Sequence, residues 1–227
     1  LKKKFLVYFT STSKDKIKKF LKNFSKEEKK NIRSIHYSFK SIDDIKVFIK
    51  KFNKVGFNIL INNARDLSNL KFKYGSYDEI ENFNKEIFMS VYLSYFLSTK
   101  LNRKNLSSVV NISSMYGIVA PNKSLYVNKY KSSPIFYGVS KAAQIHLSKE
   151  LAVRLAKYNI RVNSVSFGGV EGRVDQKFKK KYKILCPLGR MLKSNEIFEP
   201  IWFLSNNELS SGATGHNLII DGGWTIW

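Results

Sequence analysis

The sequence is poor in cysteine, in acidic residues and in long apolar stretches. Cys186 is its single cysteine, so an internal disulfide and a zinc site with several cysteine ligands are excluded. No apolar run approaches the ~20 residues needed to cross a bilayer, and the Lys-rich start has no apolar segment long enough for a signal peptide. We expect a cytoplasmic protein that holds no metal ion and has no membrane partner.

Acidic residues number 17 against 40 basic ones, which gives a formal net charge of +23. A charge of this size can indicate a nucleic-acid partner. However, arginine occurs at only seven positions. It is the residue best suited to bidentate hydrogen bonds with phosphates and base edges. The lysines are spread along the whole chain instead of lying in one segment. We therefore expect a solvated Lys-rich surface that favours anionic ligands, and no nucleic-acid partner.

Short apolar, β-branched runs alternate with longer stretches of helical spacing along the chain. The predicted strands are 5–10, 32–37, 58–62, 108–113, 160–166 and 217–221, and the predicted helices are 14–30, 41–54, 78–102, 137–158 and 194–206. Two stretches, 115–136 and 167–193, are predicted to be long loops. This alternation predicts one α/β domain over residues 1–227, a Rossmann-type doubly wound parallel sheet with helices on both faces.

Polar side chains stand where several predicted strands end. Asn62 and Asn63 close one strand, and Ser113 and Ser114 close another. In doubly wound sheets the carboxyl ends of the strands meet at the ligand crevice. A serine hydroxyl placed there can hydrogen-bond a substrate carbonyl.

Tyr137 and Lys141 stand four residues apart at the start of a predicted helix. This spacing places both side chains on one face, where the ammonium can favour the phenolate form of the tyrosine. Such a pair is suited to proton transfer. Taken alone it would more often be an ordinary surface pair, and its meaning depends on the polar strand ends around it.

The motifs INNA, NISS, YGVSK, RVN followed by GG, and TG followed by IIDGG occur in this order. In this combination the sequence resembles the short-chain dehydrogenase/reductase family over essentially its whole length. The segments MYGIVAPN, CPLGRM and GGWTIW resemble a bacterial subgroup associated with surface-glycan sugar synthesis.

The resemblance implies an NAD(P)-dependent oxidoreductase that interconverts a carbonyl and a secondary alcohol, with a sugar derivative as a candidate substrate. It makes Tyr137 the proton donor or acceptor, Lys141 the residue that assists it and binds the nicotinamide ribose, and Ser114 the serine at the substrate carbonyl. It also implies a homodimer or homotetramer. The cofactor-lining residues that it implies at the adenosine and nicotinamide ends are Asn63, Ala64, Gly168 and Val170.

The end of the first predicted strand bears on the choice of cofactor. NAD enzymes of this kind place an acid there for the adenosine ribose, whereas residues 10–14, which include Thr10 and Ser11, offer hydroxyls and a lysine. Ser38 stands where the family often has aspartate beside the adenine. We therefore expect NADP(H) to be favoured over NAD(H).

The largest departure from the family concerns glycine, since none occurs before Gly56. The family opens with a strand and a glycine turn whose amides hold the cofactor pyrophosphate. The first residues resemble instead the end of the family's first helix, so we expect one strand and one helix, about 25 to 30 residues, to be missing. The missing strand is central, so 5–10 and 58–62 are expected to pair directly or to flank a gap. Residues 1–227 alone are expected not to bind a dinucleotide with ordinary affinity.

A second departure lies near the catalytic asparagine that the family carries on its central helix, where this chain has Ser90 and Val91. The proton relay is therefore not assigned. The alternative to an active enzyme is a degenerate, catalytically inactive member that serves as a scaffold or subunit.

Overall fold

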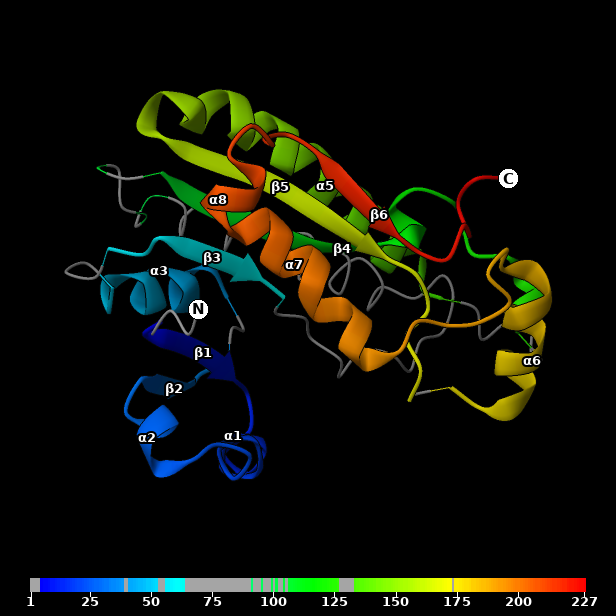
Figure 1. Cartoon of the computed structure of the whole chain (residues 1–227), viewed down its shortest axis with the longest axis horizontal. Coiled ribbons are helices and arrows are strands. Elements are labelled where there is room, and N and C mark those ends of the chain that lie inside the picture. The colour runs from blue at the N-terminus through cyan, green and yellow to red at the C-terminus, as the bar shows by residue number, and fades with distance from the viewer. Residues whose placement is uncertain are drawn as a thin grey trace. The chain divides into compact units, whose positions relative to one another are not determined.

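A computed structural model describes residues 5–38, 41–52, 56–63, 91, 95, 99, 101, 104, 106–126, 133–172 and 174–227. The chain divides into two compact units, Leu1–Val47 and Phe48–Trp227. Each unit contains a parallel sheet (Figure 1). The expectation that the whole chain forms one domain stays a prediction.

The first unit contains a two-stranded sheet with short helices. Strands β1 (Val7–Ser11) and β2 (Ile32–His36) pair in parallel, with Val7 opposite Ile32 and Ser11 opposite His36. Between them lie α1 (Lys14–Leu21) and α2 (Lys26–Lys29). The sheet is followed by α3 (Ile42–Lys50), which crosses the boundary between the units.

The single helix predicted over 14–30 is wrong, because the chain forms two helices there. The second helix begins at a capping box, in which the Ser25 hydroxyl accepts from the Glu28 backbone N–H and the Glu28 carboxylate accepts from the Ser25 N–H. A capping box satisfies two amide groups at a helix start. It favours a new helix start over continuation of α1 through Ser25.

The second unit contains a four-stranded parallel sheet in the order β3 (Ile59–Asn62), β4 (Ser107–Ser114), β5 (Ile160–Phe167) and β6 (Asn217–Ile220). Every residue of β4 and β5 is buried, as expected for strands covered on both faces. The six predicted strands are confirmed to within two residues at either end.

Helices cover both faces of this sheet (Figure 1). On one face, Val109 packs in a cluster with Leu151 of α5 (Ile135–Leu155), and on the other Val110 packs in a cluster with Leu204 of α7 (Phe198–Ser205). Successive strand residues point to opposite faces, so α5 and α7 lie on opposite sides. This is the α/β architecture that the sequence predicts.

The other elements among the described residues of the second unit are η1 (Met115–Gly117), η2 (Lys123–Leu125), η4 (Ala156–Tyr158), α6 (Gln176–Leu185), η5 (Ser194–Ile197) and α8 (Asn207–Ser210). The prediction of a loop throughout 167–193 is wrong, because α6 lies within it. Asp175 caps this helix by accepting from the Phe178 N–H at 2.8 Å. Most of the predicted helix 78–102 lies outside the described residues.

The expected direct pairing of residues 5–10 with 58–62 is not seen. β1 pairs with β2, β3 pairs with β4, and no strand pairing joins the two sheets within the described residues. The other alternative, a gap between these strands, concerns the placement of the units and stays a prediction. In the part of the chain that the structure describes, no helix is both long enough and apolar enough to span a bilayer.

Candidate active site

The candidate site begins at the amino end of α5, where Tyr137 and Lys141 share one face. The Lys141 Nζ atom lies 5.9 Å from the centroid of the Tyr137 ring. Lys141 is buried and Tyr137 is half-buried. Both side chains therefore lie on one face of α5, and their role in proton transfer stays a prediction.

The end of β4 lies against this part of α5. The Ser113 hydroxyl donates to the backbone carbonyl of Lys141 at 2.8 Å, which fixes the helix to the strand. The Ser114 hydroxyl accepts from the Tyr116 backbone N–H at 3.2 Å and caps η1. Ser114 still has its own proton and a lone pair, so it can hydrogen-bond a carbonyl as the sequence predicts.

Two glycines allow η1 to approach α5 closely. A Cβ atom on Gly117 would lie 2.7 Å from the carbonyl carbon of Lys141, and one on Gly138 would lie 2.9 Å from the carbonyl oxygen of Tyr116. As a result the Tyr116 ring stands edge-on to Tyr137, with centroids 6.4 Å apart and an interplanar angle of 88°. The Tyr116 ring therefore packs next to the Tyr137 ring and borders the candidate site.

Tyr116 also pairs with a second tyrosine, Tyr126. Their hydroxyl oxygens are 3.1 Å apart. Burial is the main cause that raises the pKa of Tyr116 far above its ordinary value, and burial also raises the pKa of Tyr126. Both phenols thus stay protonated around neutral pH and act as hydrogen-bonding groups rather than as charges.

A chain of buried polar side chains connects β3, β4 and α5. The Asn62 amide donates to the Asn111 Oδ1 atom at 2.7 Å, and the Asn111 amide donates to the Ser148 hydroxyl at 2.9 Å. The Ser148 hydroxyl in turn donates to the backbone carbonyl of Gln144. Asn62 therefore has a structural role, and the amide predicted to contact the cofactor is its exposed neighbour Asn63.

The Lys141 ammonium is held by acceptors inside the unit. It donates to the Ile112 carbonyl at 2.7 Å and to the Gln144 Oε1 atom at 2.9 Å. Sequence reasoning missed Gln144. The signal was present, since residues 136, 140, 144, 148 and 152 recur every four positions on the buried face of α5.

The segment after β5 is fixed by Tyr182 of α6. The Tyr182 hydroxyl accepts from the Gly169 backbone N–H at 2.9 Å, and the Tyr182 ring stacks on Trp224 with centroids 4.5 Å apart. Burial raises the pKa of Tyr182 to about 12. Gly168 and Val170, predicted to lie beside the nicotinamide, are half-buried. The backbone at Gly168 continues the sheet by donating to the Ile220 carbonyl at 2.9 Å.

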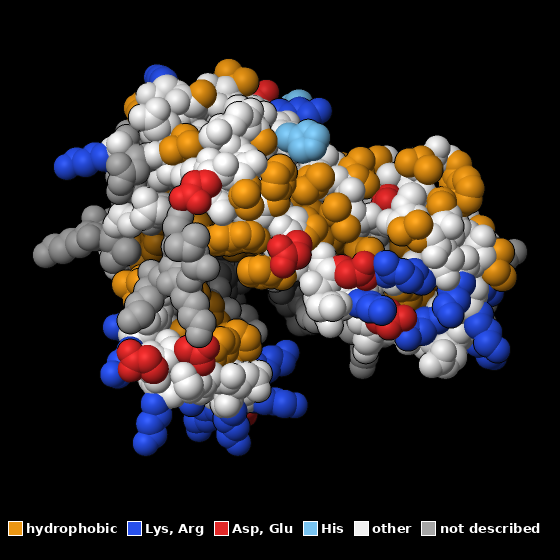
Figure 2. Space-filling model, viewed as in Figure 1, with side chains coloured by type: hydrophobic (Ala, Val, Ile, Leu, Met, Phe, Trp, Pro, Cys, Tyr) orange, Lys and Arg blue, Asp and Glu red, His pale blue; other side chains and the backbone are white. Residues whose placement is uncertain are grey.

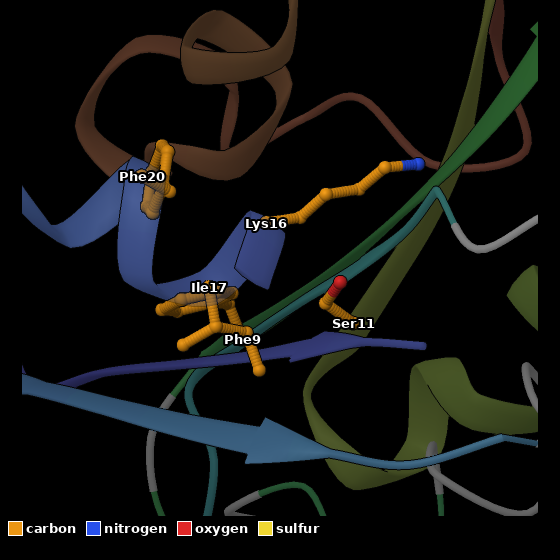
Figure 3. A pocket seen from close by; sticks show the side chains of 5 residues that line it. All are labelled: Phe9, Ser11, Lys16, Ile17 and Phe20. Atoms are coloured by element: carbon orange, nitrogen blue, oxygen red, sulfur yellow. The ribbon is translucent and has the colours of Figure 1, made fainter. Parts of the chain in front are cut away.

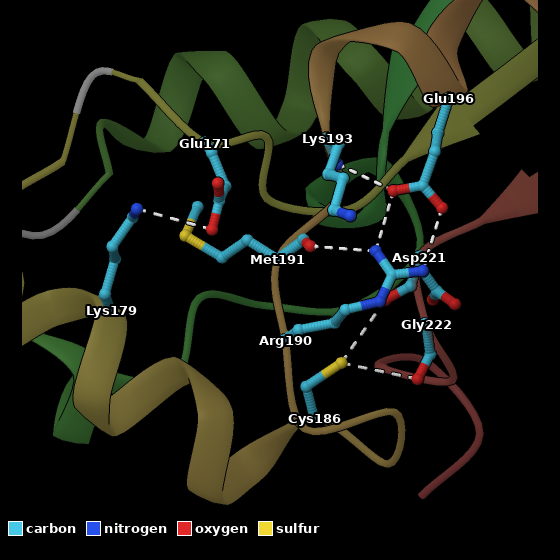
Figure 4. A network of polar contacts seen from close by, with 9 residues as sticks. All are labelled: Glu171, Lys179, Cys186, Arg190, Met191, Lys193, Glu196, Asp221 and Gly222. Carbon is cyan, nitrogen blue, oxygen red and sulfur yellow. Dashed lines mark hydrogen bonds and ion pairs between the residues drawn. The ribbon is translucent and has the colours of Figure 1, made fainter.

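A polar network stabilises the region between α6 and η5 (Figure 4). Arg190 donates to both carboxylate oxygens of Glu196, at 2.7 and 2.8 Å. The Arg190 guanidinium lowers the pKa of Glu196 to about 2. Lys179 and Glu171 form a further ion pair at 3.3 Å. These contacts order a segment that the sequence analysis treats as loop.

The residues expected at the adenosine end belong to the first unit. Thr10 and Ser38 are exposed, and Ser11 is half-buried. Ser11 also lines a small pocket between β1 and α1, where Figure 3 shows its hydroxyl and the Lys16 side chain beside apolar groups. The lining side chains are Phe9, Ser11, Lys16, Ile17 and Phe20. The placement of these residues relative to Tyr137 stays a prediction, and Ala64 lies outside the described residues.

The described residues fit one end of a nicotinamide cofactor. The Lys141 ammonium lies against the end of β4, which Ser114 closes, and 5.9 Å from the centroid of the Tyr137 ring, so the nicotinamide ribose and a carbonyl could be held there. The pyrophosphate end is different, because residues 1–55 contain no glycine and the described part of them has no turn of the glycine-rich type. Among the described residues there is also no cluster of three or more His, Cys, Asp or Glu that could hold a metal ion.

The parallel sheet has helices on both faces, and the tyrosine–lysine pair lies on α5 at the carboxyl end of β4. Together these features define a dehydrogenase of the Rossmann type. Residues 2–225 match the sequence model of a family described as enoyl-(acyl carrier protein) reductase. The chain thus belongs to the short-chain dehydrogenase/reductase family, whose members are NAD(P)-dependent oxidoreductases.

Curated relatives match at moderate identity. The post-translational flagellin modification protein A of Campylobacter coli is 29% identical over 207 residues, covering 88% of this chain and 80% of that protein. The D-arabinitol 2-dehydrogenase of Candida tropicalis is 34% identical over 148 residues. That match covers 61% of this chain and 49% of that protein, so it spans about half of the relative.

Solved structures show the same fold. A short chain dehydrogenase from Leptospira borgpetersenii with bound NAD+ has a TM-score of 0.77 and 27% identity, covering 98% of this chain and 93% of that one. ElxO with NADP bound has a TM-score of 0.75 and 26% identity, covering 98% and 89%. The expected family, fold class and dependence on a nicotinamide cofactor are confirmed.

Proposed function

We propose that this protein interconverts a carbonyl and a secondary alcohol, with Tyr137 as proton donor in reduction and proton acceptor in oxidation. The observation that carries the proposal is the Tyr137–Lys141 pair, in which the ammonium lies 5.9 Å from the ring centroid and against the end of β4, the strand that Ser114 closes. The nicotinamide cofactor, when bound, supplies or accepts the hydride. Lys141 and the cofactor-lining residues Asn63, Ala64, Gly168 and Val170 would hold it.

Each of the three side chains has a separate task. The Ser114 hydroxyl holds the substrate oxygen by a hydrogen bond, and the Tyr137 hydroxyl gives its proton to the same oxygen as the carbonyl becomes an alcohol. The Lys141 ammonium stabilises the phenolate that remains. Holding these groups on β4 and α5 keeps the reacting atoms aligned and lowers the entropic cost of reaction.

The substrate class is a sugar or sugar-like polyol derivative. Support comes from a relative named for flagellin modification and from another named for D-arabinitol oxidation. The Tyr116 and Tyr126 hydroxyls, 3.1 Å apart, place hydrogen-bonding groups close to Tyr137. A panel of keto sugars and simple ketones tests this point, and faster turnover of the simple ketones would contradict it.

The cofactor preference is for NADP(H), because Thr10 and Ser11 supply hydroxyls and no acid stands within 10–14. Structures of relatives hold either NAD+ or NADP, so they support a nicotinamide cofactor without selecting one. We also propose a cytoplasmic homo-oligomer without a nucleic-acid partner. DNA binding that weakens steeply with added salt would contradict that last point.

Substitution of Tyr137 and Lys141 in the full-length protein tests the proposed chemistry. Tyr137→Phe should reduce kcat at least ~100-fold, the usual scale of general acid–base catalysis, with cofactor affinity nearly unchanged. Lys141→Ala should reduce kcat and weaken cofactor binding. A Tyr137→Phe enzyme with more than about a tenth of the normal rate would exclude this residue from proton transfer.

The alternative function is a catalytically inactive scaffold or subunit. The observation in its favour is the absence of the family's asparagine at Ser90 and Val91. The buried and ordered setting of Ser114 and Lys141 favours the enzyme. A full-length protein that binds cofactor but turns over no carbonyl or alcohol in the panel would support the scaffold.

A further inference from the structure

Gln144 occupies an unusual place for a long polar side chain. It lies on the buried face of α5, only 2% exposed, and its Oε1 atom accepts a hydrogen bond from the Lys141 ammonium at 2.9 Å. A buried amide is costly unless it is hydrogen-bonded, and a buried ammonium is still more costly. The two groups therefore stabilise each other three residues apart on one helix.

The contact with Gln144 also determines where the positive charge lies. The same ammonium donates to the Ile112 carbonyl at 2.7 Å, so two acceptors from β4 and α5 hold it 5.9 Å from the Tyr137 ring centroid. A flexible lysine side chain would otherwise distribute its charge over many rotamers. Two fixed acceptors keep the charge beside the phenol.

On this basis we propose that Gln144 is a positioning residue, which orients the Lys141 ammonium toward Tyr137. The inference rests on the proposed function, because it assigns a second residue to the support of the same proton transfer. It would give this chain a means of holding the lysine that does not depend on an asparagine at positions 90 and 91, where the sequence has serine and valine.

Two titratable groups near Tyr137 besides Lys141 are uncharged around neutral pH. They are Tyr116, edge-on to the ring, and Tyr126, which pairs with Tyr116. Both are phenols held neutral by burial. Two of the β4 groups that contact Lys141, the Ile112 carbonyl and the Ser113 hydroxyl, do not titrate.

A cofactor-free titration tests the proposal directly. Tyrosine labelled with carbon-13 at Cζ reports each phenol by NMR, and the signal lost in Tyr137→Phe identifies Tyr137. In Gln144→Glu a carboxylate of nearly the same shape offsets the ammonium charge. The Tyr137 signal should then titrate about one pH unit higher, the usual scale for one neighbouring charge.

Two further variants keep the test decisive if Gln144→Glu fails to fold. Gln144→Met has a similar length but no acceptor, so the ammonium is held less firmly and the Tyr137 midpoint should rise by a smaller amount. Ser148→Ala is the matched control, because the Ser148 hydroxyl belongs to the same buried network but bonds to the Asn111 amide and the Gln144 backbone carbonyl rather than to the Gln144 side chain. It should lower thermal stability and leave the Tyr137 midpoint in place.

The outcomes separate this inference from the proposed function. An unchanged Tyr137 midpoint in both Gln144 variants would overturn the positioning role. So would an equal rise in Ser148→Ala, because the effect would then be structural. If Tyr137→Phe of the full-length protein retains its activity, the proposed function fails whatever the titration shows. If that variant is inactive and the midpoint does not move, only the role of Gln144 fails.

Discussion

At the scale of single residues, the candidate site depends on how a few polar groups are buried and paired. Ser113, Ser114 and Lys141 each make a defined hydrogen bond that leaves the site ordered before any ligand binds. Preorganised groups need little rearrangement during reaction. Ser114 and Lys141, two of the residues proposed for catalysis, are therefore held in place before a ligand binds.

The proposed cofactor preference leads to a prediction at the same scale. In the full-length protein, NADPH should bind more tightly than NADH, because residues 10–14 contain no acid that would oppose the 2′-phosphate. Ser11→Asp introduces the acid that NAD enzymes use, and should weaken NADPH at least about tenfold while affecting NADH much less. Fluorescence titration with both cofactors measures this.

The matched control for that substitution is Ser11→Asn, which keeps the shape of aspartate without its charge. Either side chain can accept from the Ser13 backbone N–H as the Ser11 hydroxyl does at 3.2 Å. The asparagine variant should keep the preference for NADPH. Equal affinities of the wild-type protein for the two cofactors, or a preference for NADH, would contradict the proposed preference for NADP(H).

Among the candidate residues, those with side-chain chemistry could be predicted from the sequence, and the supporting residues were missed. Tyr137, Lys141 and Ser114 stand in motifs with fixed spacing, and the structure places Lys141 beside both the Tyr137 ring and the end of β4 that Ser114 closes. Gln144 contacts Lys141 three residues away on α5, and its four-residue spacing with other buried residues is a local signal that marks its face but not its partner. Tyr182 contacts Gly169 through the packing of α6 against the segment after β5, which leaves no local pattern in the sequence.

At the scale of elements, the spacing of apolar residues along the sequence predicted the strands better than the helices. Strands β4 and β5 are continuous buried runs, which the sequence displays directly. Helix α6 was missed because only a narrow face is buried, with Tyr182 fully inside and five lysines along the rest. The chain starts a second helix after α1 because of the local capping box at Ser25, which the spacing of apolar residues does not reveal.

The contact between η1 and α5 gives a prediction at this scale. Gly117→Ala places a Cβ atom 2.7 Å from backbone of Lys141, so η1 must move away from the helix. Overpacking of this kind typically costs ~1–3 kcal/mol. The variant should unfold at lower denaturant concentration and lose activity, because Tyr116 and the cap on Ser114 move with η1.

Gly212→Ala is the control for this experiment. A Cβ atom at Gly212 meets no atom within 4 Å. Its unfolding free energy should stay within about 0.5 kcal/mol of the wild type, as for most surface substitutions. Equal stability of the two variants in urea titration would show that η1 does not pack against α5 as closely as described.

At the scale of the whole molecule, exposed apolar side chains support assembly. Figure 2 shows such side chains gathered over α7 and β6. Phe198, Phe203 and Ile219 are 61%, 42% and 43% exposed. Trp227 is exposed as well, whereas Trp224 is buried in its own unit against Tyr182.

We therefore predict a homodimer or homotetramer. Exposed apolar patches of this kind are more often contact surfaces than solvent-facing ones. Light scattering of the full-length protein across a range of concentrations gives the mass of the assembly. A mass equal to one chain at every concentration would contradict the prediction, and it would leave the chemistry at Tyr137 untouched.

Transfer of a labelled hydride tests the central claim most directly. The full-length protein is incubated with NADPH deuterated at the transferable position and with a panel of keto sugars, and the alcohol products are analysed by mass spectrometry. The account predicts one deuterium on the new carbinol carbon with the wild type, and at least ~100-fold less labelled product per unit time with Tyr137→Phe. No labelled alcohol from any ketone, or equal labelling by the Tyr137→Phe protein, would contradict it.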